Sequence, residues 1–226
     1  MKKNIFVALD YNSLDKALDT TDKLKDWIAG VKIGTELYSS CGMEGVNRFK
    51  DLGVDIFLDL KLGPEIPNQV KKTITVIASN YKIKYLTVHT MGSYEMLLAA
   101  KEASNSIELL GVTILTSWDQ KNLDSIGSNN SLERQIKLLV NLAIKSKLNG
   151  VIASANDIPL VRSLSKNLKI FCPGIRSGGN QQDQKRVTNY ADFVKIADEK
   201  CFAVIGRPII DGDPVQNIKK IIQSAK

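Results

Sequence analysis

Eight short segments rich in apolar and β-branched residues recur along the chain, and this recurrence limits the fold more than any other feature of the sequence. Such segments are typical of buried β-strands. They span residues 4–10, 30–34, 54–60, 84–89, 108–115, 150–154, 169–174 and 202–207. Stretches with apolar residues at helical spacing lie between them, as in 13–27, 131–147 and 213–225. Eight strand-then-helix units predict a (β/α)8 TIM barrel that occupies residues 1–226 as a single domain.

The main alternative is an open doubly wound sheet, which shares the alternation of strands and helices. That fold needs a glycine-rich turn for a phosphate group directly after its first strand. Here the end of the first strand and the turn after it read "ALDYNSLD", without a glycine. The polar segment 124–131 is typical of a loop, and no linker rich in proline or serine divides the chain. The sequence therefore favours the closed barrel.

Composition and charge narrow the class of function. With 43% hydrophobic and 24% charged residues, the sequence is that of an ordinary globular protein. The formal charge of +7 comes mainly from lysines scattered along the chain, without a block of like charges. That distribution is more typical of a solvated surface, and no basic motif interleaved with aromatic residues predicts nucleic-acid binding.

The cysteines and the N-terminal segment bear on where the protein works. Cys41, Cys172 and Cys201 lie far apart without C-x-x-C spacing, so neither a disulfide framework nor a zinc site is predicted. The first apolar run stops at Asp10 and is too short for a signal sequence, and no segment is long enough to span a membrane. We therefore expect a cytoplasmic protein that does not bind membranes.

Polar residues stand at the ends of several predicted strands. The strands of a TIM barrel direct their C-terminal ends to one face, where catalytic residues gather. The residues in these positions are Asp10, Lys32, Asp59, Lys61, His89, Ser154, Gly206 and Arg207. His89, the single histidine, fits packing beneath the barrel rim at least as well as a general base, and Trp118 fits loop packing. We assign no role to these two residues, and the others are candidates for a site.

Four of these residues form a predicted array of alternating charges. Asp59 and Lys61 are two apart on one strand, so their side chains are expected on the same face. Lys32 comes from the neighbouring strand and Asp10 from the strand beyond it. Burying charges is costly unless they are paired and hydrogen-bonded. The array therefore indicates either a catalytic site or a structural ion network that closes the barrel.

A series of motifs occurs in order from one end of the chain to the other. They are "FVALDY", "VKIGTELYSSCG", "FLDLKLGPEIPNQV", "LGVTILTS", "GVIASA", "CPGIRSGG" and "AVIGRPI". Together they resemble the orotidine 5'-phosphate decarboxylase family. The most specific is the third, which is similar to the family pattern Asp-x-Lys-x-x-Asp-Ile-Pro-Asn.

The resemblance implies a homodimeric barrel that converts orotidine monophosphate to uridine monophosphate in de novo pyrimidine synthesis, with no metal and no organic cofactor. Loss of carbon dioxide from C6 leaves a vinyl carbanion without a conjugated sink, so the protein must stabilise the charge and supply a proton. Lys61 is the expected proton donor, because its ammonium favours the transition state over the substrate. Asp59 would hold Lys61 and press against the substrate carboxylate, and Lys32 would balance Asp59.

The resemblance also assigns substrate contacts. Asp10 is similar to the residue that hydrogen-bonds the ribose, and Ser154 to the residue that contacts the pyrimidine edge. The phosphate is expected on Arg207 and on backbone N–H groups near Gly206. Thr116, just after the fifth strand segment, is also expected to bind the substrate.

The chain departs from the family pattern after Lys61. Three residues, 62–64, separate Lys61 from Glu65 where the family has two. Glu65 replaces an aspartate that reaches into the active site of the other subunit, and Gln69 replaces a threonine that contacts the partner's ligand. Glu65 also fits a carboxylate in the opening turn of the third helix, where the helix dipole stabilises it, and both interpretations stay open.

A third departure lies in the motif "GIRSGG". Gly178 stands where the family has a glutamine that closes over the phosphate. Gln181 or Gln182, a few residues further on, is a hypothetical substitute for that amide.

Two alternative functions remain. The related keto-gulonate-phosphate decarboxylases and hexulose-phosphate synthases share the Asp-x-Lys pattern but bind magnesium through a glutamate at the end of strand two. Lys32 stands there in this chain, where an ammonium would repel the cation, and Glu36 is typical of a solvated helix residue. The second alternative is a non-catalytic barrel that binds a phosphate ligand. Lys32, Asp59 and Lys61 argue against it, because a binder gains nothing from costly buried charge.

Overall fold

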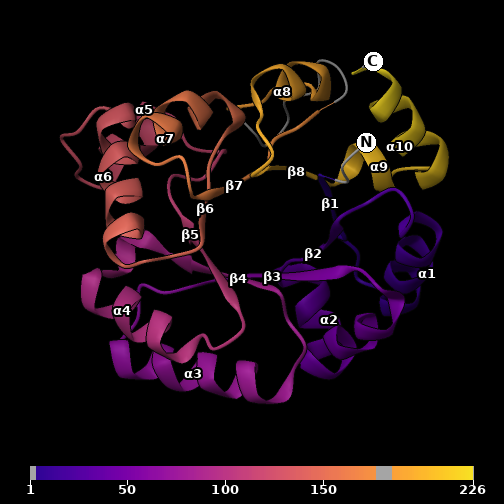
Figure 1. Ribbon diagram of the computed structural model, residues 1–226, viewed down its shortest axis with the longest axis horizontal. Helices are drawn as coiled ribbons and strands as arrows, with labels where there is room; N and C mark the ends of the chain where they lie inside the picture. The colour runs from indigo at the N-terminus through magenta and orange to yellow at the C-terminus, as the bar shows by residue number, and fades with distance from the viewer. Residues whose placement is uncertain (1–3, 177–184, 226) are drawn as a thin grey trace.

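The computed structural model describes residues 4–176 and 185–225, and these form a closed β-barrel surrounded by helices (Figure 1). The strands are parallel, neighbours in the chain are neighbours in the sheet, and β1 closes the barrel against β8. The strands are β1 Ile5–Ala8, β2 Gly30–Ile33, β3 Asp55–Leu62, β4 Tyr85–His89, β5 Glu108–Val112, β6 Gly150–Ile152, β7 Lys169–Cys172 and β8 Cys201–Ile205. Each overlaps a segment predicted as a strand, so the (β/α)8 barrel is confirmed.

Helices pack around the outside of the barrel (Figure 1). The α-helices of the described ranges are α1 Leu14–Leu24, α2 Thr35–Asn47, α3 Pro67–Asn80, α4 Tyr94–Ala103, α5 Gln120–Ser125, α6 Leu132–Lys145, α7 Ile158–Leu164, α8 Tyr190–Ile196, α9 Arg207–Ile210 and α10 Pro214–Gln223. Short 3-10 helices occur at η1 Arg48–Leu52, η2 Thr90–Gly92 and η3 Ala155–Asp157. The side chains of Ser13, Ser131 and Asp213 accept backbone N–H groups at the starts of α1, α6 and α10. These three helices lie inside the ranges predicted for them.

Apolar side chains fill two separate layers of the core. One layer lies between the strands and the helices. The other is an aromatic cluster inside the barrel, where the ring centroids of Phe6 and Phe171 are 5.1 Å apart and those of Phe171 and Phe202 are 4.8 Å apart. Ala8 and Val204 belong to this cluster and also line a cavity at the C-terminal ends of the strands. The cluster therefore forms an apolar floor beneath the predicted site.

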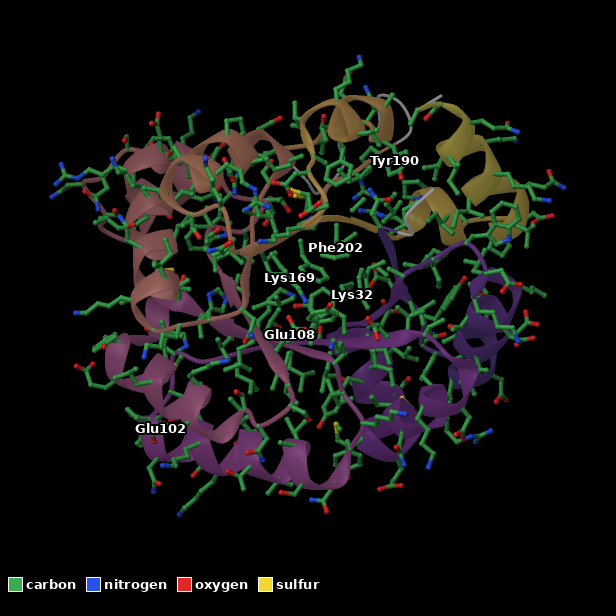
Figure 2. All side chains as sticks on the ribbon, viewed as in Figure 1. Lys32, Glu102, Glu108, Lys169, Tyr190 and Phe202 are labelled. Atoms are coloured by element: carbon green, nitrogen blue, oxygen red, sulfur yellow. The ribbon has the colours of Figure 1, made fainter. Side chains whose placement is uncertain are left out.

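Charged side chains gather at the opposite end of the barrel from the predicted site. The Nζ atom of Lys169 donates to both carboxylate oxygens of Glu108, at 2.9 and 2.6 Å, and both residues lie near the centre of the strand ring in Figure 2. The Nζ atom of Lys84 is 3.3 Å from the same carboxylate. Burial, together with the negative charge of Glu108, raises the pKa of Tyr85 to about 12. This network pairs the charges where the strands begin.

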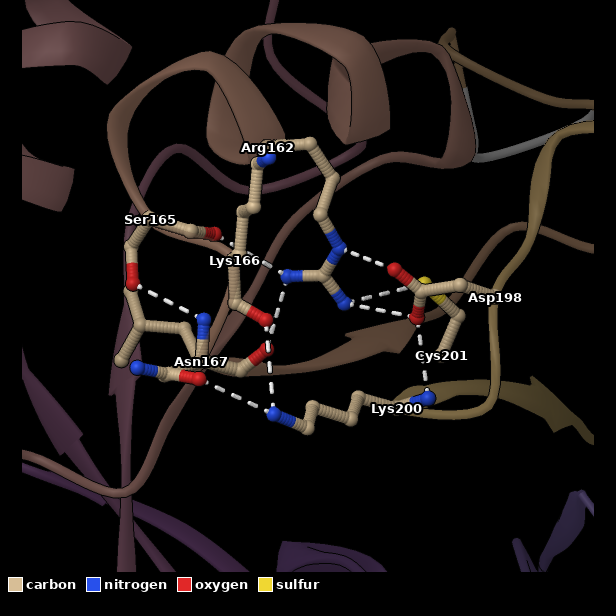
Figure 3. A network of polar contacts seen from close by, with 8 residues as sticks. Arg162, Ser165, Lys166, Asn167, Asp198, Lys200 and Cys201 are labelled. Carbon is tan, nitrogen blue, oxygen red and sulfur yellow. Dashed lines mark hydrogen bonds and ion pairs between the residues drawn. The ribbon is translucent and has the colours of Figure 1, made fainter.

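A second network joins α7 to the segment before β8 (Figure 3). The guanidinium of Arg162 contacts the carboxylate of Asp198 through Nε and through Nη2, the latter at 2.9 Å. Its Nη1 donates to the carbonyl of Leu168 at 2.8 Å, and its Nη2 contacts the Sγ atom of Cys201 at 3.5 Å. The hydrogen bond from Arg162 is the main reason that the pKa of Asp198 falls to about 2.

Cys41, Cys172 and Cys201 are free cysteines, and the last two are buried. Within the described ranges, no helix combines the length and the apolar character needed to cross a bilayer.

Candidate active site

A cavity of about 340 Å³ opens at the C-terminal ends of the strands. Seven of the residues predicted from the sequence line it: Asp10, Lys32, Asp59, Lys61, Thr116, Gly206 and Arg207. They come from β2, β3 and the segments after β1, β5 and β8, so distant parts of the sequence meet at one face. Further lining residues, from Pro173 to Arg176, follow β7.

The predicted charge array is present at this cavity. The Nζ atom of Lys61 lies 2.8 Å from Oδ2 of Asp59, and the Nζ atom of Lys32 lies 3.8 Å from the same oxygen. Lys32 also donates to Oδ1 of Asp10 at 3.1 Å. The two lysines and two aspartates therefore alternate in space, as predicted from their positions on the strands.

Asp59 is the buried centre of the array, with 7% of its surface exposed. Burial alone would raise the pKa of this carboxyl, because it disfavours the charged form. The positive charges of Lys32 and Lys61 and the hydrogen bonds from Lys61 and Thr87 outweigh burial, so the pKa of Asp59 lies below its usual value. Asp59 is therefore an anion near neutral pH, held between two cations.

The backbone at Lys61 is not that of a regular strand. Leu58 pairs with Leu86 and Leu62 pairs with Val88, so the register between β3 and β4 shifts across the intervening residues. Lys61 has a φ of 51°, in the left-handed region that non-glycine residues rarely adopt. The predicted contact with Asp59 is present, and it occurs where the strand is irregular and not within a regular ladder.

The residues assigned to phosphate and ribose lie together. Gly206 precedes α9, which begins at Arg207. A Cβ atom added at Gly206 would lie 3.0 Å from Oδ2 of Asp10 and 3.3 Å from the Cβ of Ala8. The absence of a side chain at Gly206 thus leaves room beside Asp10 at the cavity wall.

Three predicted site residues do not line this cavity. Ser154 is 1% exposed, and its Oγ accepts the N–H of Asn156 at the start of η3. Glu65 is exposed and accepts the N–H of Ile66 at 2.6 Å, immediately before α3. Gln69 lies in the first turn of α3 and lines a different groove. Neither Glu65 nor Gln69 therefore lines the cavity of its own chain.

Several other sequence expectations have varied outcomes. Gly178, Gln181 and Gln182 lie outside the described residues. Trp118 is partly buried and packs against the core, as predicted. Burial lowers the pKa of His89, and the positive charge of Lys61 lowers it further. The buried Nδ1 atom of His89 has no hydrogen-bond partner among the described residues. A low pKa favours a neutral imidazole.

Sequence reasoning missed two residues that organise the site. Thr87, on β4, contacts both Asp59 and the backbone of Lys61. Arg186 pairs with Asp157 at 2.7 Å and donates to the carbonyl of Ile114 at 2.8 Å, which fixes the wall after β5. Thr87 stands two residues before His89 on the same strand, and side chains two apart on a strand lie on the same face. This alternation was the one signal in the sequence that could have indicated Thr87.

No group of three or more His, Cys, Asp or Glu side chains arranged to hold a metal ion occurs in the described ranges. At the array itself, the space beside Asp10 and Asp59 contains the Nζ atom of Lys32. The Lys32 ammonium thus contacts both carboxylates, and carboxylates are the ligands that a hard divalent cation would need there.

The chain is similar to known proteins along nearly its whole length. Residues 3–221 match the orotidine 5'-phosphate decarboxylase / HUMPS family. The orotidine 5'-phosphate decarboxylase of Ehrlichia chaffeensis is 41% identical over 225 residues, which cover 97% of this chain and 96% of that protein. That of Methylacidiphilum infernorum is 37% identical over 221 residues, with 96% of this chain and 94% of that protein covered.

A solved structure gives the same result for the fold. The crystal structure of orotidine 5'-phosphate decarboxylase from Lactobacillus acidophilus superposes with a TM-score of 0.83 and 26% identity, over 100% of both chains. The motifs, the barrel and the array at its C-terminal face therefore have one explanation: the chain belongs to the orotidine 5'-phosphate decarboxylase / HUMPS family.

Proposed function

We propose that this chain decarboxylates orotidine 5'-monophosphate to uridine 5'-monophosphate, a step of pyrimidine biosynthesis, without a metal or an organic cofactor. The observation that carries the proposal is the array at the cavity, in which the Lys61 ammonium is paired with the buried carboxylate of Asp59. Two relatives that are 41% and 37% identical to this chain are named orotidine 5'-phosphate decarboxylases, which also supports the proposal.

The chemistry explains why the array is charged. When the bond between C6 and the carboxylate breaks, negative charge develops on a ring carbon that has no conjugated sink. A positioned ammonium stabilises that charge more in the transition state than in the substrate, and this difference accelerates the reaction. We assign this role to Lys61, which then transfers a proton to C6.

Asp59 and Lys32 prepare Lys61 for this step. The low pKa of Asp59 keeps it an anion, and its 2.8 Å contact holds the Lys61 ammonium at the cavity. The substrate carboxylate would lie against Asp59, and the repulsion between them would end when carbon dioxide leaves. Lys32, at 3.8 Å, partly compensates Asp59 and keeps the array close to neutral.

The remaining lining residues suit a nucleotide. Asp10 would accept a ribose hydroxyl, and Arg207 with the backbone near Gly206 would hold the phosphate. Thr116, which lines the wall after β5, would contact the pyrimidine. The pyrimidine contact expected of Ser154 rests on the resemblance alone, because Ser154 is 1% exposed and does not line the cavity. A cavity of about 340 Å³ falls in the range of small-molecule sites.

We further propose a homodimer whose active sites are shared across the interface. An open groove is lined by residues of α2, of α3 and of the end of β3, among them Tyr38, Leu62 and Val76. Val76 is 57% exposed and Ile66 is 67% exposed, values that are high for large apolar side chains. In such a dimer, the resemblance assigns Glu65 and Gln69 to the cavity of the partner.

The free thiols fit a reducing compartment, and we propose the cytoplasm as the site of the protein.

The magnesium-dependent sugar-phosphate reactions of the same family are less suited to this chain. Their metal would have to displace the Lys32 ammonium from Asp10, 3.1 Å away, and from Asp59.

A substrate comparison tests the proposed function. Purified protein would be incubated with orotidine monophosphate in a chelator, and separately with keto-gulonate phosphate and hexulose phosphate in magnesium. We expect turnover of the nucleotide alone, at a rate that the chelator does not change. Turnover of a sugar phosphate that requires magnesium, with none of the nucleotide, would overturn the proposal.

A further inference from the structure

We propose that Thr87 is a positioning residue for the Lys61 and Asp59 pair, which it holds through one hydroxyl group. The inference rests on the proposed function and adds a residue to it. Thr87 lies on β4, is fully buried at 0% exposure, and does not line the cavity. It therefore acts through its neighbours and does not touch the substrate.

The hydroxyl of Thr87 makes two hydrogen bonds whose directions are fixed. The backbone N–H of Lys61 donates to Oγ1 of Thr87 at 2.8 Å. Because an amide N–H can only donate, the hydroxyl keeps its own proton for another acceptor. That acceptor is Oδ1 of Asp59, at 3.0 Å. A carboxylate can only accept, so both bonds form at once without competition.

The first bond lies where the pairing of β3 with β4 is irregular. The register of β3 against β4 shifts between Leu58 and Leu62, and Thr87 stands on β4 between the partners of those two residues. At the shift, the Lys61 N–H donates to the side chain of Thr87 on β4. Its left-handed φ of 51° is unfavourable for lysine and persists only where the surroundings hold it. The Thr87 hydroxyl is such a support.

The second bond orients the carboxylate of Asp59. With Oδ1 tied to Thr87, the other oxygen, Oδ2, faces the ammonium groups of Lys61 at 2.8 Å and Lys32 at 3.8 Å. Thr87 thus holds Lys61 twice, directly at its backbone and through Asp59 at its Nζ atom. Rotation of the Asp59 carboxylate would change the position of the ammonium at the cavity.

Other buried threonines near the site make a different kind of bond. The hydroxyl of Thr90 donates to the carbonyl of Val112 at 2.7 Å, and that of Thr113 donates to the carbonyl of Ile152 at 2.8 Å. These bonds join backbone segments and involve no charged group. Thr87 differs because its acceptor is a member of the array.

The test compares Thr87→Val, which keeps the shape but removes both bonds, with Thr87→Ser, which keeps the hydroxyl. The matched control is Thr21→Val, because Thr21 is equally buried and its hydroxyl donates to the Ala17 carbonyl of α1, away from the cavity. We expect Thr87→Val to lower kcat about 100-fold, the cost of a misplaced catalytic group, while the KM for orotidine monophosphate changes little. Thr87→Ser should recover most of kcat, and Thr21→Val should keep it.

A crystal structure of Thr87→Val gives a readout that does not depend on activity, and Thr87→Ala replaces it if that variant does not fold. We expect Lys61 to leave the left-handed region or its Nζ atom to lose Oδ2 of Asp59. An unchanged pair, or equal kcat values for Thr87→Val and Thr21→Val, would overturn the proposal. Absence of turnover in the unmodified protein would instead reject the proposed function. The crystal structure of Thr87→Val would then test by itself whether Thr87 holds the Lys61 and Asp59 pair.

Discussion

The Nζ atom of Lys61 lies 2.8 Å from Oδ2 of Asp59, and this pair is built on a strand that bulges between Leu58 and Leu62. Asp59 is buried, whereas the Lys61 side chain is 36% exposed at the cavity. The anion is thus fixed inside the protein, and the cation extends from it toward the space for the substrate.

Removing the ammonium should abolish turnover but not binding. We expect Lys61→Ala to lower kcat by about 10⁴-fold or more, because it removes both the stabilising charge and the proton donor. The affinity for uridine monophosphate, measured by titration calorimetry, should change much less. Lys61→Arg is the control: it keeps a charge but does not release a proton near neutral pH. Equal losses of kcat and of affinity in Lys61→Ala would contradict the assigned role.

Neutralising Asp59 should reduce both activity and stability. We expect Asp59→Asn to lower kcat by about 10² to 10³-fold, because the Lys61 ammonium loses its ionic partner. Two ammonium groups would then lie close together, so the free energy of unfolding should fall by up to about 3 kcal/mol in urea titrations. Asp26→Asn, at an exposed position outside the barrel, should change neither quantity. A fully active Asp59→Asn variant would show that the carboxylate has no part in turnover.

The Arg162 and Asp198 pair in Figure 3 predicts a pH dependence of stability. The folded pKa of Asp198 is about 2, below the usual value of about 3.9 in unfolded chains. The stabilisation is therefore complete above the unfolded pKa and is lost as the pH falls toward the folded pKa. Because Asp198 is 45% exposed, solvent screening limits the effect to about 1 kcal/mol or less.

A double-mutant cycle with Arg162→Met and Asp198→Asn would measure this coupling by urea unfolding at pH 7, 4 and 3. We expect the coupling free energy to be largest at pH 7 and to decrease at the two lower values. A coupling that stays constant over this range would show that the charge of Asp198 is not involved.

The groove between α2 and α3 predicts the effect of a charge on assembly. We expect Val76→Lys to convert the protein to a monomer in light-scattering measurements, because the lysine would have to be buried at the interface. Activity should fall with the dimer, since Glu65 and Gln69 would no longer reach a partner's cavity. Ile126→Lys is the matched control, because Ile126 is also exposed, at 51%, but lies outside this groove. A monomeric unmodified protein, or a fully active Val76→Lys monomer, would refute the shared site.

The sequence was sufficient to predict the barrel because eight strands recur with helices between them. It was also sufficient for the array, since polar residues at the C-terminal ends of barrel strands meet at one face. Lys32, Asp59 and Lys61 were found in this way. These side chains come together because of the topology of the barrel and not because of fine geometry. Errors of one or two residues in the predicted strand ends therefore left the predicted array unchanged.

The details that hold Lys61 could not be predicted. Strand periodicity assumes a regular ladder, whereas the register shift between Leu58 and Leu62 depends on how β3 and β4 pair. In the sequence, Thr87 is an ordinary β-branched strand residue, because its hydrogen bonds are made to another strand. Glu65 and Gln69 are assigned to a partner's site by resemblance, and a single chain shows only that they do not line their own cavity.

The most direct test of the central claim is the amount of carbon dioxide and uridine monophosphate formed from orotidine monophosphate in a chelator, with Lys61→Ala measured in parallel. The account predicts equal amounts of the two products from the unmodified protein, at a rate that the chelator does not alter. It predicts none above background from a Lys61→Ala variant that still folds and binds uridine monophosphate. Turnover that stops in the chelator, or that survives the loss of Lys61, would contradict a metal-free decarboxylation carried by the Lys61 and Asp59 pair.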